Sequence, residues 1–140
     1  KPAGLTHAEM AVMKQHTYYT FSILITIGGL QMIAEWGAYH HERLDGKGYP
    51  FRREAHEMNL GARIMAVSDI FTALAEDRPY RKGMKTENIR NILQEQASHG
   101  IQDPHIVKLL LENIAEVRRV VTERQEQAQH YYQTEVERSE

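Results

Sequence analysis

The residues with the clearest chemical potential are two adjacent histidines, His40 and His41, followed by a glycine-punctuated loop that ends at Pro50. Neutral imidazole is a common protein ligand for transition metals. Adjacent residues on an α-helix point about 100° apart. We therefore expect His40 and His41 to reach different ions of a two-metal cluster rather than to chelate one ion together. Two neighbouring metal ions are a common arrangement for phosphoester hydrolysis.

Two further side chains are candidate ligands, His16 in the first predicted helix and Asp69 in the middle of the strongest one. Aspartate is a poor helix-interior residue, and burying it between Val67, Ile70 and Phe71 without a partner would be costly. Each residue also has a plainer explanation, since a lone histidine is more often structural and Asp69 could face solvent. Three imidazoles and one carboxylate without sulfur suit iron, manganese or zinc.

The loop after the histidines contains Gly46, Gly48, Tyr49 and Pro50. Glycine permits positive φ and a close approach of the backbone to a ligand, and a tyrosine ring can stack on a nucleobase. The same residues alone would also suit an ordinary surface turn. Their position directly after the two histidines favours a substrate-binding loop.

A second polar segment, Asp77 to Lys82, contains the cations Arg78, Arg81 and Lys82. Arginine suits bidentate contacts to phosphate, so the segment is a candidate phosphate clamp. A solvated charged turn is the more frequent role of such runs, and both interpretations remain open at this stage.

Three segments, His40–Pro50, Gly61–Phe71 and Asp77–Lys82, resemble in order the motifs of the HD-GYP family. The resemblance spans roughly residues 1–111 and implies a cytoplasmic bacterial signalling enzyme that uses two or three iron or manganese ions to hydrolyse cyclic di-GMP to pGpG or GMP. By similarity, the metal ligands are His16, His40, His41 and Asp69, the catalytic residues are His40, His41 and Asp69, and the substrate-facing residues are Gly48, Tyr49, Pro50, Arg78 and Arg81.

The chain departs from the family pattern in two places. The His-Asp pair that gives the family half its name does not occur here, and Phe51–Asn59 keeps the usual length but lacks the usual glycines and proline. Lys1 is not a natural start, so we expect the chain to be part of a longer protein with an upstream receiver or sensor domain. The missing pair leaves a catalytically inactive ligand-binding or interaction module as the alternative, and it predicts exposed apolar surface, with self-association or an altered fold as the result. The altered stretch leaves another cyclic dinucleotide or another phosphoester open as substrate.

Composition limits the remaining possibilities. The 140 residues suit one domain, and a net charge of −2 gives no general attraction to DNA or to anionic membrane. There is no cysteine, which excludes disulfides and thiolate metal sites. The longest apolar stretch, Phe21 to Leu30, is too short and too interrupted to span a bilayer.

The apolar periodicity predicts an all-α helical bundle of the HD-domain superfamily type, with five or six helices and a long C-terminal helix. Thr6 and Glu9 form a predicted capping box, with Met10, Met13 and Thr17 on one face of the helix that follows. Phe21–Ile27 could be a strand, but no partner strand exists and we predict helix. The expected helices cover residues 7–19, 30–39, 60–75 and 86–97, and residues 42–59 form a loop. In the helix at 30–39, Ile33 and Trp36 or Gly37 should face inward. In the helix at 60–75, one face should carry Ile64, Val67, Phe71 and Leu74.

The last predicted helix begins at Asp103 and Pro104, an N-cap followed by proline at the first helical position. Its apolar residues follow a heptad pattern, which predicts one long helix and a possible homodimer. These residues are Val107, Leu110, Ile114, Val117 and Val121. From residue 123 the chain is nearly all polar, so we expect the domain at 1–122 and a polar helical tail at 123–140.

Overall fold

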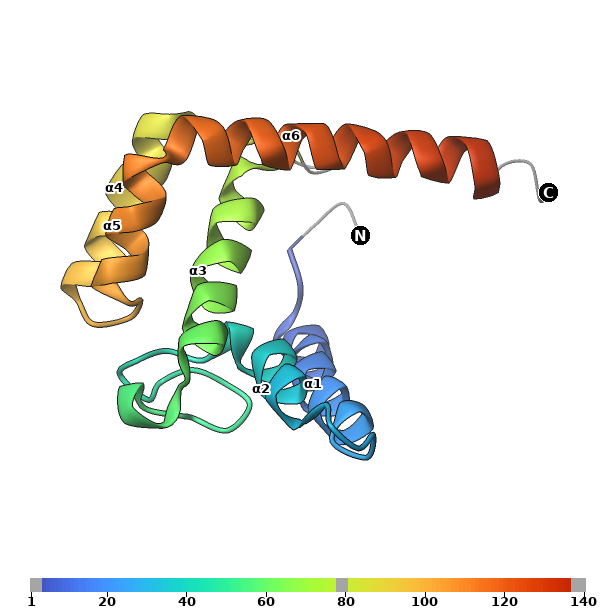
Figure 1. Cartoon of the computed structure of the whole chain (residues 1–140), viewed down its shortest axis with the longest axis vertical. Coiled ribbons are helices and arrows are strands. Elements are labelled where there is room, and N and C mark those ends of the chain that lie inside the picture. The colour runs from blue at the N-terminus through green and yellow to red at the C-terminus, as the bar shows by residue number, and fades with distance from the viewer. Residues whose placement is uncertain (1–3, 78–80, 137–140) are drawn as a thin grey trace.

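The computed structural model describes residues 4–77 and 81–136, apart from the side chains of residues 129, 135 and 136. These ranges contain six α-helices and no β-strand, which confirms the predicted all-α fold. The helices are α1 (His7–Leu24), α2 (Gln31–Ala38), α3 (Leu60–Ala75), α4 (Thr86–Ser98), α5 (Pro104–Glu112) and α6 (Ile114–Tyr131). Short helical turns cover Tyr39–His41 (η1), Ala55–Glu57 (η2) and Tyr132–Val136 (η3). Figure 1 shows α3 standing between α1, α2 and the long loop at one end and α4, α5 and α6 at the other.

The helix starts follow the predicted local signals. Thr6 and Glu9 form the predicted capping box of α1, and Asp103 caps α5 with Pro104 in the first turn. The bounds of α3 are those predicted. Helix α1 continues to Leu24 instead of ending near residue 19, so the apolar run after Phe21 begins as helix, as we predicted, and leaves the helix before Gly28.

The single helix predicted after Asp103 is wrong, because the chain breaks at Asn113. The Asn113 backbone has φ −113° and ψ 18°, which ends α5 and lets α6 cross the top of Figure 1 in a new direction. The five heptad residues all pack into or against the chain's own core. The homodimer therefore stays a prediction without a free heptad face to support it. The predicted domain boundary at residue 122 falls inside α6.

The larger hydrophobic core joins α3 to the three C-terminal helices. Its buried members are Val67, Phe71, Ile89, Leu93, Val107, Leu111 and Ile114. Burying such a side chain contributes about 1.5–3 kcal/mol. Ile64 was expected on the same face of α3, but it is 44% exposed. It lies one turn before the core begins and lines an open groove that Leu60 and Leu109 share.

The smaller core positions α2 against the first turn of α3. Its buried residues include Ala38 and Ala62, whose small side chains let the helices approach closely. A Cβ on Gly61 would lie 2.1 Å from the indole ring of Trp36. Asn59 caps α3, accepts a hydrogen bond from Trp36 Nε1 (2.9 Å) and donates one to Glu35 (2.8 Å). These contacts fix the end of α2, where the histidines follow.

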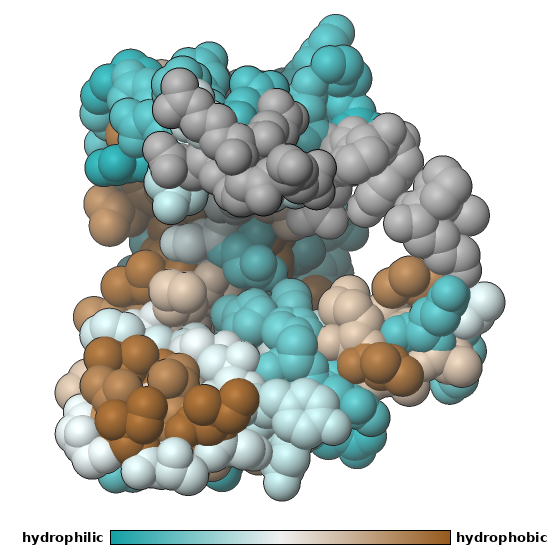
Figure 2. Space-filling view, turned by 90° about the vertical axis from the view of Figure 1, so that its right-hand side faces the viewer, coloured by the Kyte–Doolittle hydropathy of each residue, from teal (hydrophilic) through white to brown (hydrophobic). Residues whose placement is uncertain are grey.

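Helix α1 packs through a narrow face centred on buried Thr17, and much of its apolar surface stays exposed. Met10 and Met13, expected on one shared face of this helix, are 37% and 43% exposed, and Ile33 in α2 was predicted to face inward but is 48% exposed. Figure 2 shows hydrophobic surface gathered in the lower part of the face that it presents. Across the described helices, none combines the length and the apolar character that a membrane crossing requires.

Candidate metal centre and adjoining loop

Three histidines from two elements converge at one point. His16 comes from α1, His40 and His41 come from η1, and one ligand atom from each lies within 4.8 Å of the others. The rings of His40 and His41 are only 4.1 Å apart between centroids. The expectation that these two neighbours serve different ions stays a prediction, because the two ions of a cluster lie only about 3.5–4 Å apart and ring nitrogens this close suit either one ion or two.

The hydrogen bonds of His16 and His40 determine which nitrogen is free. Nδ1 of His16 lies 2.6 Å from the carbonyl oxygen of Met13, and Nδ1 of His40 lies 2.8 Å from that of Gly37. A carbonyl oxygen only accepts, so each Nδ1 carries the proton and each Nε2 presents a lone pair. The two Nε2 atoms face each other at 3.2 Å.

With both rings neutral this contact brings two lone pairs together, and either a proton on one ring or a metal cation bound by both removes the repulsion. Two nitrogens bound to one ion at about 2.0–2.1 Å are separated by roughly 2.9–3.4 Å at octahedral or tetrahedral angles. The observed 3.2 Å between Nε2 of His16 and Nε2 of His40 falls in that range. The residues present therefore fit a metal ion, and their chemistry is the imidazole set that transition metals favour.

Asp69 adds a carboxylate to the histidine cluster. Its Oδ2 lies 3.5 Å from Nδ1 of His41, and its side chain is 39% exposed, which limits the cost of its position in mid-helix. Burial, with the neighbouring His40 and His16, lowers the pKa of His41 to about 4 although Asp69 opposes the shift. His41 is therefore neutral at physiological pH, the form that binds metal. All four predicted ligands line one hollow of about 660 Å³.

Glu42 is a functional candidate that sequence reasoning missed. It follows His41 directly, it is 1% exposed, and its two carboxylate oxygens accept hydrogen bonds from the backbone N–H groups of Phe51 (2.6 Å) and Arg53 (3.0 Å). Burial raises the pKa of Glu42, against the opposing effect of these donors. The signal in the sequence was the position of Glu42 between the candidate metal ligands and the glycine-rich loop. A carboxylate that is buried there needs hydrogen-bond donors, which the loop backbone can supply.

The glycine-rich loop is folded tightly against Glu42. A Cβ on Gly48 would lie 2.4 Å from the Glu42 Cα, so only glycine fits there. Gly46 adopts φ +71°, a conformation that favours glycine. The loop presents the ring of Tyr49, whose centroid lies 4.9 Å from that of His41. Burial and Asp69 raise the pKa of Tyr49, so its hydroxyl stays protonated.

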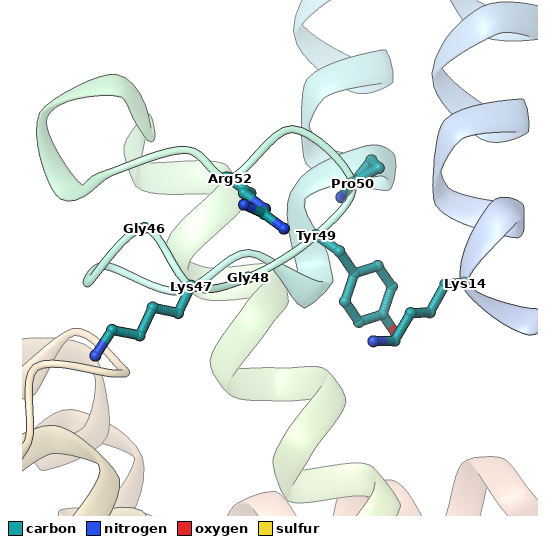
Figure 3. Close-up of a pocket in the computed structure, with 7 residues that line it drawn as sticks. All are labelled: Lys14, Gly46, Lys47, Gly48, Tyr49, Pro50 and Arg52. Atoms are coloured by element: carbon teal, nitrogen blue, oxygen red, sulfur yellow. The ribbon is translucent and has the colours of Figure 1, made fainter. Parts of the chain in front are cut away.

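A second hollow of about 550 Å³ lies beside this ring (Figure 3). Its lining residues are Lys14, Gly46, Lys47, Gly48, Tyr49, Pro50 and Arg52. The ammonium of Lys14 lies 4.9 Å from the centre of the Tyr49 ring. The predicted loop residues Gly48, Tyr49 and Pro50 are thus brought together beside the histidine cluster.

Arg63 holds the return of the loop in place, a role that the sequence did not indicate. Its guanidinium donates to the carbonyls of Met58 and Ala55 and to the carboxylate of Asp103. Burial favours the neutral form of Asp103, but Arg63 and the N–H groups of the α5 N-terminus outweigh it and lower the pKa of Asp103. The same side chain therefore links the loop to α5.

Of the two arginines predicted for the phosphate clamp, the structure describes only one. Arg78 lies outside the described residues. Arg81 donates through Nη2 to the carbonyl oxygen of Ala73 near the end of α3. That bond places its guanidinium against α3, and its predicted contact with a substrate phosphate stays a prediction.

Comparison with known proteins found a matching family model and several similar proteins. A family model described as HD domain matches residues 1–106. The chain is 34% identical over 113 residues to 3'3'-cGAMP-specific phosphodiesterase 1 of Vibrio cholerae, covering 81% of this chain and 26% of that protein. It is 37% identical to a cyclic di-GMP phosphodiesterase of Thermotoga maritima, with 86% of this chain and 33% of that protein covered. The cyclic di-GMP phosphodiesterase response regulator RpfG of Xanthomonas campestris is 36% identical, with coverages of 86% and 32%. The chain thus spans a quarter to a third of the length of these relatives.

Proposed function

Because this chain belongs to the HD domain family, in its HD-GYP type, we propose that it carries part of the active site of a phosphodiesterase that hydrolyses cyclic di-GMP to pGpG or GMP. The observation that carries the proposal is the pair of Nε2 lone pairs of His16 and His40 facing each other at 3.2 Å, with His41 beside them. This arrangement suits a metal cation, because it directs imidazole nitrogens from two elements at one point.

We assign His16, His40, His41 and Asp69 as ligands for two or three iron or manganese ions, the metals that match imidazole and carboxylate donors without sulfur. Bound at these residues, the ions would lower the pKa of a water molecule and offset the charge of the phosphate, which is the chemistry that phosphodiester hydrolysis at neutral pH needs. His40, His41 and Asp69 are the catalytic residues in this proposal.

The remaining residues hold and position the substrate. The carbonyls of Met13 and Gly37 keep His16 and His40 in the tautomer that binds metal. Glu42 anchors the loop that carries Tyr49, and the Tyr49 ring offers a surface on which a nucleobase can stack. Gly48 and Pro50 complete the loop wall, and Arg78 and Arg81 are assigned to the substrate phosphates.

A second candidate substrate is 3'3'-cGAMP. The similarity to a relative whose name specifies that dinucleotide favours it, and the altered stretch Phe51–Asn59, which borders the loop, permits a substrate other than cyclic di-GMP. We further propose that the chain acts in the bacterial cytoplasm as the output of an upstream receiver or sensor domain, and that a homodimer forms.

The proposal is tested by anaerobic incubation of the chain with Fe(II) or Mn(II) and either dinucleotide, followed by chromatography of the nucleotides. Hydrolysis of cyclic di-GMP supports the main proposal, and hydrolysis of 3'3'-cGAMP alone supports the second. Absence of turnover in a folded, metal-loaded sample contradicts hydrolysis by this chain alone, and the chain is then at most half of a site. Binding without turnover would instead favour a ligand-binding module.

A further inference from the structure

The cationic side chains of this chain divide into two groups. Of the 14 lysines and arginines in residues 4–77 and 81–136, ten form an ion pair or donate a hydrogen bond to a protein acceptor. Within those ranges the four without such a partner are Lys14, Lys47, Arg52 and Lys85. Three of these four line the hollow beside Tyr49, and no carboxylate is among the described residues that line it. A concentration of unpaired positive charge in one hollow attracts an anion.

The hollow adjoins the histidine cluster through one aromatic ring. Tyr49 lies 4.9 Å from the His41 ring, and the Lys14 ammonium lies 4.9 Å from the Tyr49 ring. Residues 12–16 of α1 border both hollows, since Lys14 lines the one beside Tyr49 and His16 the other. An anionic group bound at Lys14 would therefore lie next to the Tyr49 ring, which also adjoins His41. A ligand with two separated phosphates matches this layout.

Arg52 is held in an unusual backbone conformation at this hollow. Its φ of 56° makes it the only non-glycine residue with positive φ in the described ranges, and glycine would adopt that conformation without strain. Figure 3 shows its guanidinium directed toward Tyr49, whereas Lys47 extends away from the ring. A strained arginine at the edge of a cationic hollow is better explained by a ligand contact than by folding.

We propose that this hollow binds the second phosphodiester of the cyclic dinucleotide, the one that is not cleaved, and that Arg52 is its principal contact with Lys14 beside it. The inference rests on the proposed function. A cyclic dinucleotide carries two phosphodiesters on opposite sides of one macrocycle, so one at the metal ligands places the other away from them. The second phosphate keeps its full charge throughout the reaction, and a guanidinium donates to it in a bidentate manner.

The test compares Arg52→Gly with Lys85→Gln in the metal-loaded chain. Glycine suits the backbone at position 52, so this variant keeps the fold, and Lys85 is the unpaired cation outside the hollow. The substrates are cyclic di-GMP and bis(p-nitrophenyl) phosphate, which has a single phosphodiester. We expect Arg52→Gly to raise KM for cyclic di-GMP by roughly tenfold or more with little change in kcat, a charge-assisted hydrogen bond being lost. The loss on bis(p-nitrophenyl) phosphate should be clearly smaller, and Lys85→Gln should behave as the parent chain.

An unchanged KM for cyclic di-GMP in Arg52→Gly, or equal losses on both substrates, overturns the inference and leaves the proposed function standing. Should the unmodified chain bind cyclic di-GMP without cleaving it, hydrolysis by this chain alone is contradicted, and the Kd of Arg52→Gly decides the inference: weaker binding supports it and equal binding overturns it. If the loss in Arg52→Gly occurs with cyclic di-GMP but not with cyclic di-AMP, Arg52 contacts guanine and the phosphate assignment is wrong.

Discussion

The two ends of α3 pack against their neighbours through different kinds of residue. Its C-terminal half packs through Val67 and Phe71 into a core of large aliphatic side chains from α4, α5 and α6. Its N-terminal half meets α2 through Ala62 and Gly61, with small residues and polar contacts such as those of Asn59. Every candidate ligand except Asp69 belongs to the elements at this second end.

This difference places most of the stabilising core at one end of α3 and most of the candidate site at the other. Large buried aliphatic groups contribute most of the hydrophobic stabilisation, whereas close helix approach through small residues leaves room for histidines and a buried carboxylate. Asp69 lies on α3 between the two ends, so the stable core orients the ligand that the site takes from it. Local stability is expected to be lower at the end that carries the site.

The largest expected effect is the loss of metal from the site. Replacement of both His40 and His41 by alanine removes two of the three converging imidazoles, so bound iron or manganese, measured by elemental analysis, should fall to background. Because the large core is untouched, the circular dichroism spectrum should keep its helical form. Unchanged metal content would show that the ligand assignment is wrong.

Phe71→Ala is expected to lower the stability of the fold without removing a metal ligand, because Phe71 belongs to the large core. Phe71 is 1% exposed, so its truncation should lower the free energy of unfolding by about 3–5 kcal/mol. Urea denaturation monitored by fluorescence or circular dichroism measures the effect. A loss below about 1 kcal/mol would mean that α3 does not depend on this core.

Gly61→Ala is expected to affect both the stability of the fold and metal binding. The added methyl would lie 2.1 Å from the Trp36 ring, so we expect a loss of about 1–3 kcal/mol of stability from overpacking and weaker metal binding, because α2 carries the histidines. Gly100→Ala is a poor control because of its positive φ. Gly4→Ala, which meets no atom within 4 Å, is the matched one.

A fourth prediction concerns the pH dependence of the metal-free chain. The pKa of His41 falls from 6.5 to about 4 in the folded state, chiefly through burial. The unfolded chain therefore binds more protons, so the stability linked to His41 is present above pH 6.5 and is lost as pH falls toward 4. We expect a loss of about 1–3 kcal/mol over this interval relative to His41→Gln. Parallel stability curves for the two proteins would contradict it.

The smallest effect is expected on α6. Arg119 pairs with Glu116 and Glu123 on an exposed helix surface, where water and salt screen ion pairs so that they contribute little to stability. Arg119→Ala should therefore change the melting temperature only slightly and leave metal content and ligand affinity unaltered. A large change would indicate that α6 has a partner in solution.

Local sequence signals predicted the elements well. The capping box at Thr6, the bounds of α3 and the start of α5 at Asp103 all depend on residues a few positions apart. The order of the motifs around His40 and Asp69 likewise indicates the family from the amino-acid sequence alone. These features are local in the chain, so a single sequence contains them in full.

Contacts between distant residues required the tertiary structure. The sequence could not show that His16 would meet His40 at 3.2 Å, that Glu42 would hold the backbone of Phe51 and Arg53, or that Ile64 would stay exposed. Each depends on how helices pack and on side-chain rotation, which periodicity does not specify. The sequence by itself therefore determined the helices and the kinds of ligand atom, and only the packing of α1 and α2 on α3 decided that those atoms meet at one point.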